Sequence, residues 1–143
     1  MTNSTSKPSI WFWVISVIAL FWNFFGVFQY LYTAYNQVEM LETMTQVQRE
    51  VFEAIPAWAT ACFAIAVFSG TIACIALLLR KKWAKPLFIL SFITAVAQFI
   101  NWLFIQNADE VFPNSYAMPI TVTIIGLLLI MFSTKSIQKG WLK

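Results

Sequence analysis

Long runs of apolar residues alternate along the chain with short polar segments. Four of these runs approach or exceed the roughly 20 residues that an α-helix needs to cross about 30 Å of hydrocarbon. They cover residues 10–32, 57–79, 86–106 and 117–133, and none contains Asp, Glu, Lys, Arg or His. Strands of a membrane barrel would alternate apolar and polar residues over about half this length. The pattern therefore predicts four membrane-spanning helices, of which the fourth is the shortest.

The polar segment between the first two spans carries a second pattern. Its apolar residues recur at intervals of three or four, namely Leu41, Met44, Val47, Val51 and Ile55. Such spacing predicts an amphipathic helix over approximately residues 38–55. Two roles remain open for it, a packing cap on the bundle or a lid over a ligand site.

Composition supports a membrane protein. Of the 143 residues, 60% are hydrophobic and only 10% are charged, whereas a soluble domain carries about a quarter charged residues. So few charges cannot solvate the surface of a small globule. We therefore expect a single all-α transmembrane domain over residues 1–143, an integral membrane four-helix bundle.

The charged residues are segregated along the chain. Eight of the nine basic residues precede the first span, join the second to the third, or follow the fourth: Lys7, Arg80, Lys81, Lys82, Lys85, Lys135, Lys139 and Lys143. Arg49 and every acidic residue fall on the other side: Glu39, Glu42, Glu50, Glu53, Asp109 and Glu110. By the positive-inside rule, both termini are cytoplasmic and the amphipathic helix is extracytoplasmic. We expect the first span to be retained, because no small-residue cleavage site follows it.

Partners follow from the same charges. The loops predicted to be cytoplasmic account for the net charge of +3, so we expect lipid headgroups and no nucleic acid as partners. In the second span, small residues recur every four positions as Cys62, Ala66, Gly70 and Cys74. With Gly26 in the first span, they predict close helix packing, within one chain, in a homo-oligomer or with a partner membrane protein. The two cysteines lie about 18 Å apart along a helix, too far for a disulfide.

Polar residues inside the spans are the candidate ligand contacts. In the stretch FWNFFG, Asn23 lies about 20 Å into its helix, and Gln98 and Thr121 lie near the same level. The other candidates for a ligand-binding or pore-lining layer are Asn101, Trp22 and Trp102, with Gln29, Thr60, Gln106 and Asn107 nearer the outer side. Two explanations remain open. The amides and hydroxyls hydrogen-bond between helices and fix their register, or they line a cavity for a neutral ligand.

What the spans lack restricts the chemistry. Without a carboxylate, histidine or lysine in the membrane, a proton relay is difficult to build. Small multidrug resistance transporters, similar in length, require a glutamate in their first span, which is absent here. No histidine is available for haem or metal ligation, and no phosphate-binding glycine loop or nucleophile motif is present. We expect no catalytic residues, no metal and no cofactor, and hence not an enzyme.

A family resemblance rests on WNFFG at residues 22–26, PAWATACFAIAVFSG at 56–70, LLLRKKWAKPLF at 77–88, NADEV at 107–111 and MPITVTIIG at 118–126. The chain resembles a family of small uncharacterised bacterial four-helix inner-membrane proteins, sometimes loosely labelled sugar transporters. The resemblance implies a bacterial inner-membrane location. The residues that it assigns to the family pattern are Asn23, Gly26, Trp58, Asn107, Glu110 and Pro119.

Two functions are compatible with these features. The first is binding or passage of a small neutral polar or amphipathic solute without ion coupling, through the polar layer of the bundle. The second is a non-transporting structural or accessory subunit of a larger membrane complex.

Overall fold

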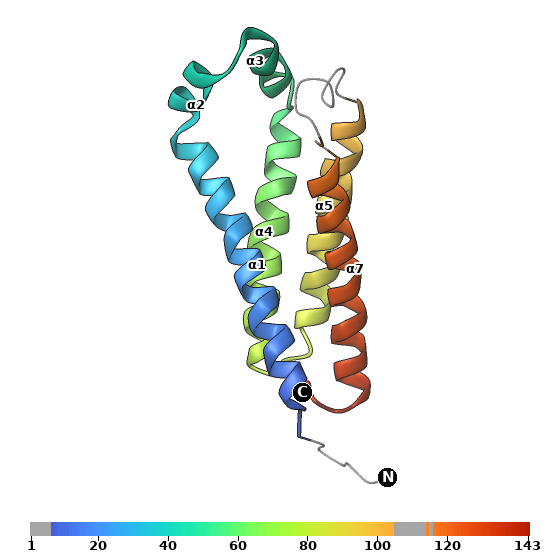
Figure 1. The fold of residues 1–143 in the computed structure, drawn as a ribbon. Coiled ribbons are helices and arrows are strands. Elements are labelled where there is room, and N and C mark those ends of the chain that lie inside the picture. The colour runs from blue at the N-terminus through green and yellow to red at the C-terminus, as the bar shows by residue number, and fades with distance from the viewer. Residues whose placement is uncertain (1–6, 105–113, 115) are drawn as a thin grey trace.

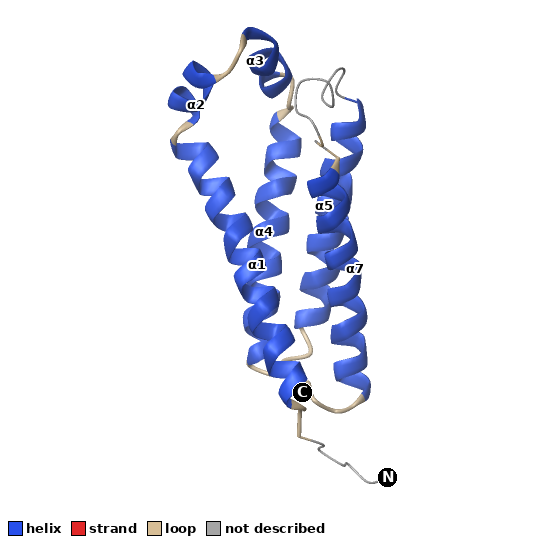
Figure 2. Cartoon of the chain, viewed as in Figure 1, coloured by secondary structure: helices blue, strands red, loops and turns tan. Residues whose placement is uncertain are grey.

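The computed structural model of the protein describes residues 7–104, 114 and 116–143. All regular structure in these residues is α-helical (Figure 2). Within them, four helices are long and apolar enough to cross a membrane: α1 (Ile10–Tyr35), α4 (Ala57–Leu78), α5 (Ala84–Phe104) and α7 (Ala117–Gln138). The predicted all-α chain with four such helices is confirmed.

The four long helices stand side by side, with α4 between its two neighbours. α1 packs along α4, α4 along α5, and α5 along α7, and no comparable contact joins α1 to α7 in the described chain. The start of α1, the connection from α4 to α5 and the C-terminus lie at one end of the bundle (Figure 1). We call this the basic end, because Arg80, Lys81 and Lys82 lie in that connection. The short helices α2 (Gln37–Thr43) and α3 (Gln46–Glu53) lie at the opposite, far end.

Burial is concentrated toward the basic end. The buried residues of α1 are Phe12, Ser16 and Ala19, all in its first half. Those of α7 are Leu129, Ser133 and Ser136, all in its second half. Because α1 and α7 run in opposite directions, both sets lie near the basic end. Toward the far end, α1 leans away from α7 (Figure 1).

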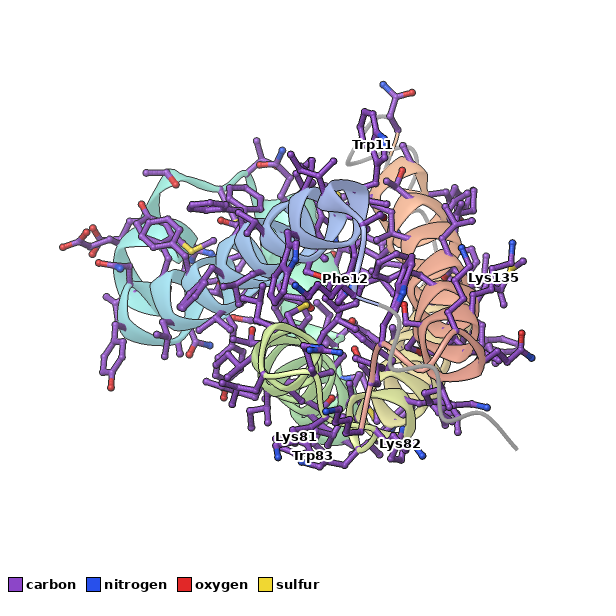
Figure 3. All side chains as sticks on the ribbon, turned by 90° about the horizontal axis from the view of Figure 1, so that it is seen from below. Trp11, Phe12, Lys81, Lys82, Trp83 and Lys135 are labelled. Carbon is purple, nitrogen blue, oxygen red and sulfur yellow. The ribbon has the colours of Figure 1, made fainter. Side chains whose placement is uncertain are left out.

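An aromatic residue fills the middle of the basic end. Phe12 is fully buried, stacked on Phe132 with ring centroids 5.7 Å apart and edge-on to Trp141 at 5.6 Å. Figure 3 shows Phe12 directed between the helices, whereas Trp11 and Lys135 point outward. The same buried cluster includes Cys74, Leu77, Phe88, Leu129 and Leu142. We call it the basic-end cluster.

The last residues of the chain close this end. The backbone N–H of Lys143 donates to the carbonyl of Arg80 at 2.7 Å, and that of Lys82 donates to the carbonyl of Lys143 at 3.0 Å. Leu142 is thereby held in the basic-end cluster, 1% exposed. Two left-handed residues make the turns, Arg80 with φ 58° and Gly140 with φ 73°, as is common after the last turn of a helix.

Several helix boundaries differ from the predicted spans, since α1 continues to Tyr35, α4 ends at Leu78 and α5 starts at Ala84. The largest difference is in the fourth span. The fourth span was predicted to end at Ser133, where the apolar run stops, but α7 continues to Gln138. In its extra turn, Ser136 is buried and its hydroxyl donates to the Phe132 carbonyl at 2.8 Å, while Lys135 points outward (Figure 3), so polar residues continue the helix beyond the apolar run. The fourth span is thus not the shortest of the described helices. Residues 105 and 106, the predicted end of the third span, lie outside the described residues.

The prediction of one amphipathic helix over residues 38–55 is wrong. The helix breaks at Met44, which is extended, and α3 starts after Thr45. Thr45 and Gln48 form a capping box, in which each side chain accepts a hydrogen bond from the other residue's backbone N–H, at 3.3 and 3.0 Å. The sequence contains this start signal as Thr-x-x-Gln. The apolar periodicity continues across the break, however, and for that reason it predicted a single helix.

Candidate functional site

A cavity of about 440 Å³ lies among all four long helices. We call it the inter-helix cavity. Most of its lining comes from the halves of the helices nearer the far end. The lining residues are Trp22, Asn23, Phe25, Gly26 and Gln29 of α1; Phe63, Ala66 and Val67 of α4; Ser91, Ala95, Gln98, Phe99 and Trp102 of α5; and Met118, Pro119 and Val122 of α7. Most of these side chains are apolar or aromatic, and none is charged. A few polar groups within an apolar wall are typical of small-molecule sites.

Asn23 lies at the floor of the cavity and is partly engaged in packing. Its side-chain N–H₂ group donates to the carbonyl of Ala19, one turn earlier in α1, at 2.9 Å, and to Cys74 Sγ of α4 at 3.4 Å. Since a carbonyl only accepts, the nitrogen must be the atom on the Ala19 side. The oxygen, Oδ1, then lies against Gly70 of α4, where no side chain intervenes. No described residue donates a hydrogen bond to this oxygen.

Ser91 brings α5 to the same place. Its hydroxyl donates to the Ala66 carbonyl of α4 at 2.7 Å, and its oxygen would lie 3.1 Å from a Cβ added at Gly70. Polar side chains of α1 and α5 therefore approach α4 around one glycine. The other hydroxyls in the spans behave differently, because Thr71, Thr94 and Thr123, for example, donate to carbonyls within their own helices.

Unlike Asn23 and Ser91, Gln98 makes no side-chain hydrogen bond to another helix in the described chain. It is half-buried, it lines the cavity from α5, and its side-chain amide makes no hydrogen bond within the described chain. The residues Ser91, Ala95, Gln98 and Trp102 follow one another at intervals of three or four and all line the cavity. This spacing places them on one face of α5. The amide of Gln98 therefore offers one acceptor and two donors to the cavity.

The structure also places the two deep tryptophans at this site. Trp22 lines the cavity from α1 and Trp102 from α5, two helices that are not packed neighbours. Phe25, Phe63 and Phe99 add three more rings to the wall.

Some of the expected residues do not reach the cavity. Thr121 is exposed, and its hydroxyl donates to the Ala117 carbonyl at 2.7 Å, while the neighbouring Val122 faces the cavity instead. Asn101 and Thr60 also lie outside the lining. Gln106, Asn107 and Glu110 lie outside the described residues.

The small residues of the second span lie along the α4 surface that receives α1 and α5. Ala66, Gly70 and Cys74 are buried, and Cys62, nearer the far end, is half-buried. A Cβ added at Gly26 of α1 would come within 2.9 Å of Val67 Cγ1, so α1 approaches α4 closely there. Both cysteines are free thiols.

The cavity is closed toward the basic end. None of its lining residues belongs to the basic-end cluster, in which Phe12, Cys74 and Leu77 are fully buried. Among the described residues, the lining of the cavity thus stops short of the basic end and does not continue through the bundle as a pore.

Metal chemistry has no visible basis here: the described residues contain no group of three His, Cys, Asp or Glu side chains suited to hold an ion. In comparisons with protein families, with curated proteins and with solved structures, nothing matches this chain. The function must therefore be inferred from the cavity itself.

Proposed function

We propose that the protein binds a small neutral polar or amphipathic solute in the inter-helix cavity, as the first step of its passage across the membrane without ion coupling. The observation that carries the proposal is Gln98, a side-chain amide that lines the cavity and has no hydrogen-bond partner in the described chain. An amide in an apolar setting without a partner is destabilising. A ligand with a complementary carbonyl, hydroxyl or amide group would remove that penalty.

Size and charge favour the same class of ligand. The volume of about 440 Å³ falls in the range of roughly 300–1,000 Å³ typical of small-molecule sites. Because no charged side chain lines the cavity, an ionic ligand would be desolvated without a counter-charge. The four long helices also lack an acidic residue, so a bound coupling ion would have no carboxylate ligand there.

Passage requires a second conformation, since the cavity is closed at the basic end. The contacts that must separate are those of Phe12 with Phe132 and Trp141, and those that hold Leu142 in the cluster. The solute path proposed here thus has a closed side, formed by the basic-end cluster, and a cavity on the other side.

We further propose that the chain lies in a bacterial inner membrane with its basic end in the cytoplasm. The start of α1, the α4–α5 connection and the C-terminus, with the lysines of these segments, lie together at that end (Figure 1) and support this orientation. Single cysteines at Glu42 and Lys139, introduced one at a time after Cys62→Ala and Cys74→Ala, test this. In intact cells, a membrane-impermeant maleimide should label the cysteine at position 42 and spare that at position 139; the reverse result would invert the orientation.

Uptake by liposomes containing the purified protein tests the function. A screen of neutral solutes should find at least one whose uptake exceeds that of empty liposomes, and Asn23→Leu with Gln98→Leu should abolish the increase. Thr121→Val is the matched control, because it changes a polar residue at a similar depth outside the cavity. Unchanged uptake in the folded double variant would refute the site.

The accessory-subunit alternative predicts a different result. Gentle detergent extraction would then recover a partner membrane protein at constant stoichiometry, and the liposomes would take up no solute. Repeated recovery of the chain alone, together with uptake, would reject this alternative.

A further inference from the structure

α1 and α7 are the two long helices that do not pack on each other along most of their length. They leave a seam between them along one side of the bundle. α1 packs on α4 and α7 packs on α5, without a comparable contact between α1 and α7. Within the part of the chain that the structure describes, the aromatic contact between them, Phe12 on Phe132, lies at the basic end, and the buried residues of both helices are confined to that end. We call the remaining length, toward the far end, the α1–α7 seam.

The inter-helix cavity reaches this seam. α1 and α7 both contribute to its wall, and residues of that wall are at the same time open to the outside. Phe25 of α1 is 51% exposed and Met118 of α7 is 49% exposed, although both line the cavity. For a bundle that crosses a membrane, the outside at this depth is hydrocarbon rather than water.

The polar groups of the cavity are few, and most of their capacity is already used. Asn23 donates its amide hydrogens to Ala19 and Cys74, and Ser91 donates its proton to Ala66. What remains free is the Gln98 amide and the Asn23 carbonyl oxygen, with Gln29 nearer the far end. A sugar has several hydroxyls that would each need a partner. The free groups of the cavity could satisfy a ligand that has a single polar head group. The apolar remainder of that ligand would lie against the apolar part of the wall.

From this arrangement, and resting on the proposed function, we infer that the ligand is a bilayer-dissolved amphiphile with one neutral hydrogen-bonding head group. It reaches the cavity sideways through the α1–α7 seam. The head group hydrogen-bonds to Gln98 and to Asn23 Oδ1. The hydrocarbon part lies against Phe25, Met118 and Val122.

Binding of simple probes tests the ligand class. The full chain in phosphatidylcholine vesicles is titrated with hexanamide, octanamide and glucose, and tryptophan fluorescence is recorded. Octanamide should bind more tightly than hexanamide by about fourfold per added methylene, referred to the aqueous concentration. Gln98→Leu should weaken octanamide binding by about tenfold, the loss of one buried hydrogen bond. Glucose should leave the fluorescence unchanged.

The outcomes separate this inference from the proposed function. If glucose binds in a manner that depends on Gln98 and octanamide does not, a neutral solute occupies the cavity but the amphiphile is wrong. If none of the probes binds, and no other neutral solute is taken up in the liposome screen, both fail together.

The sideways route is tested with lipid-borne quenchers. Phosphatidylcholine brominated on its acyl chains should quench Trp22 and Trp102, so the Trp22→Phe, Trp102→Phe double variant should lose part of the quenchable fluorescence. Octanamide should relieve part of the quenching in the unsubstituted chain and none in the double variant. Trp141→Phe is the control, because that ring packs against Phe12 at the basic end. Equal quenching of the double variant and the unsubstituted chain, the result if a second copy or a partner helix covers the seam, would overturn the route.

Discussion

The side-chain oxygen of Asn23 on α1 lies against the α-carbon of Gly70 on α4, in the space that a larger residue at position 70 would occupy. A Cβ added there would collide with Asn23 Oδ1 and approach Ser91 Oγ to 3.1 Å. The absence of a side chain at Gly70 is thus what lets polar groups of two helices meet a third.

Gly70→Ala should therefore destabilise the bundle. The new methyl must displace Asn23 from Cys74 or move α4 away from α1. An over-packed interior of this kind costs about 1–3 kcal/mol, measured as a lower unfolding free energy or midpoint temperature in detergent. Gly126→Ala is the matched control, because its nearest contact is the edge of the Phe92 ring at 3.1 Å, which a small ring shift relieves. Adding Asn23→Ala should restore part of the stability lost in Gly70→Ala, and a purely additive loss would contradict the contact.

Asn23 and Gln98 should respond differently to the same substitution. Asn23→Leu removes the hydrogen bond to Cys74 and should lower stability by about 0.6–2 kcal/mol. Gln98→Leu removes no hydrogen bond within the described chain and replaces an unpartnered amide with an apolar side chain, so the unfolding free energy should equal or exceed that of the unsubstituted protein. Thermal unfolding of both variants without added solute checks this. Equal losses would mean that Gln98 also serves packing, and the proposed ligand site would lose its main support.

The four long apolar helices could be predicted because hydropathy reflects the solvent that surrounds a whole segment. The level of the polar layer was also predictable, since the helical rise of 1.5 Å per residue converts sequence position into depth. The side of each helix that faces the cavity could not be predicted in this way. Thr121 and Val122 lie at nearly one depth, but Val122 faces the cavity and Thr121 does not. Which side faces inward depends on the neighbouring helix, and the first-span and fourth-span sequences do not reveal that α1 and α7 fail to pack together.

Part of the cavity lining could also be predicted from the spacing of residues in α5. The spacing of Ser91, Ala95, Gln98 and Trp102 places small, polar and aromatic residues on one face of α5. Gln98 and Trp102 of this stripe were already candidates from the sequence, and the same spacing adds Ser91 and Ala95 to the face. The engagement of Asn23 with Cys74, in contrast, joins residues 51 positions apart and could be found only from the fold.

The start of α3 provides a local prediction. Thr45→Ala removes the side-chain oxygen that accepts from the Gln48 backbone N–H at 3.3 Å, and the loss of an N-cap costs about 1 kcal/mol. Amide hydrogen exchange over Gln46–Glu53 should accelerate by about fivefold, the factor that 1 kcal/mol represents. Thr43→Ala is the control, because the Thr43 hydroxyl donates to Met40 in α2. Equal acceleration of α3 in both variants would show that the capping box does not stabilise this helix.

The closure of the bundle at the basic end can be tested through the reactivity of Cys74. Cys74 is fully buried in the cluster that also contains Leu142, so its thiol reports whether this end opens. In a Cys62→Ser background, Leu142→Ala should leave a void that costs about 2–5 kcal/mol. Maleimide labelling of Cys74 in mild detergent should then accelerate by at least about tenfold, which corresponds to 1.4 kcal/mol in the opening equilibrium.

Trp11→Ala provides the control, because Trp11 lies at the same end and points outward (Figure 3). In this variant, the labelling rate of Cys74 should match that of the unsubstituted background. If Leu142→Ala leaves the rate unchanged while the chain stays folded, the C-terminal residues do not close the solute path, and the closed side of the cavity must be formed by Phe12 and its neighbours on α4 and α7 alone.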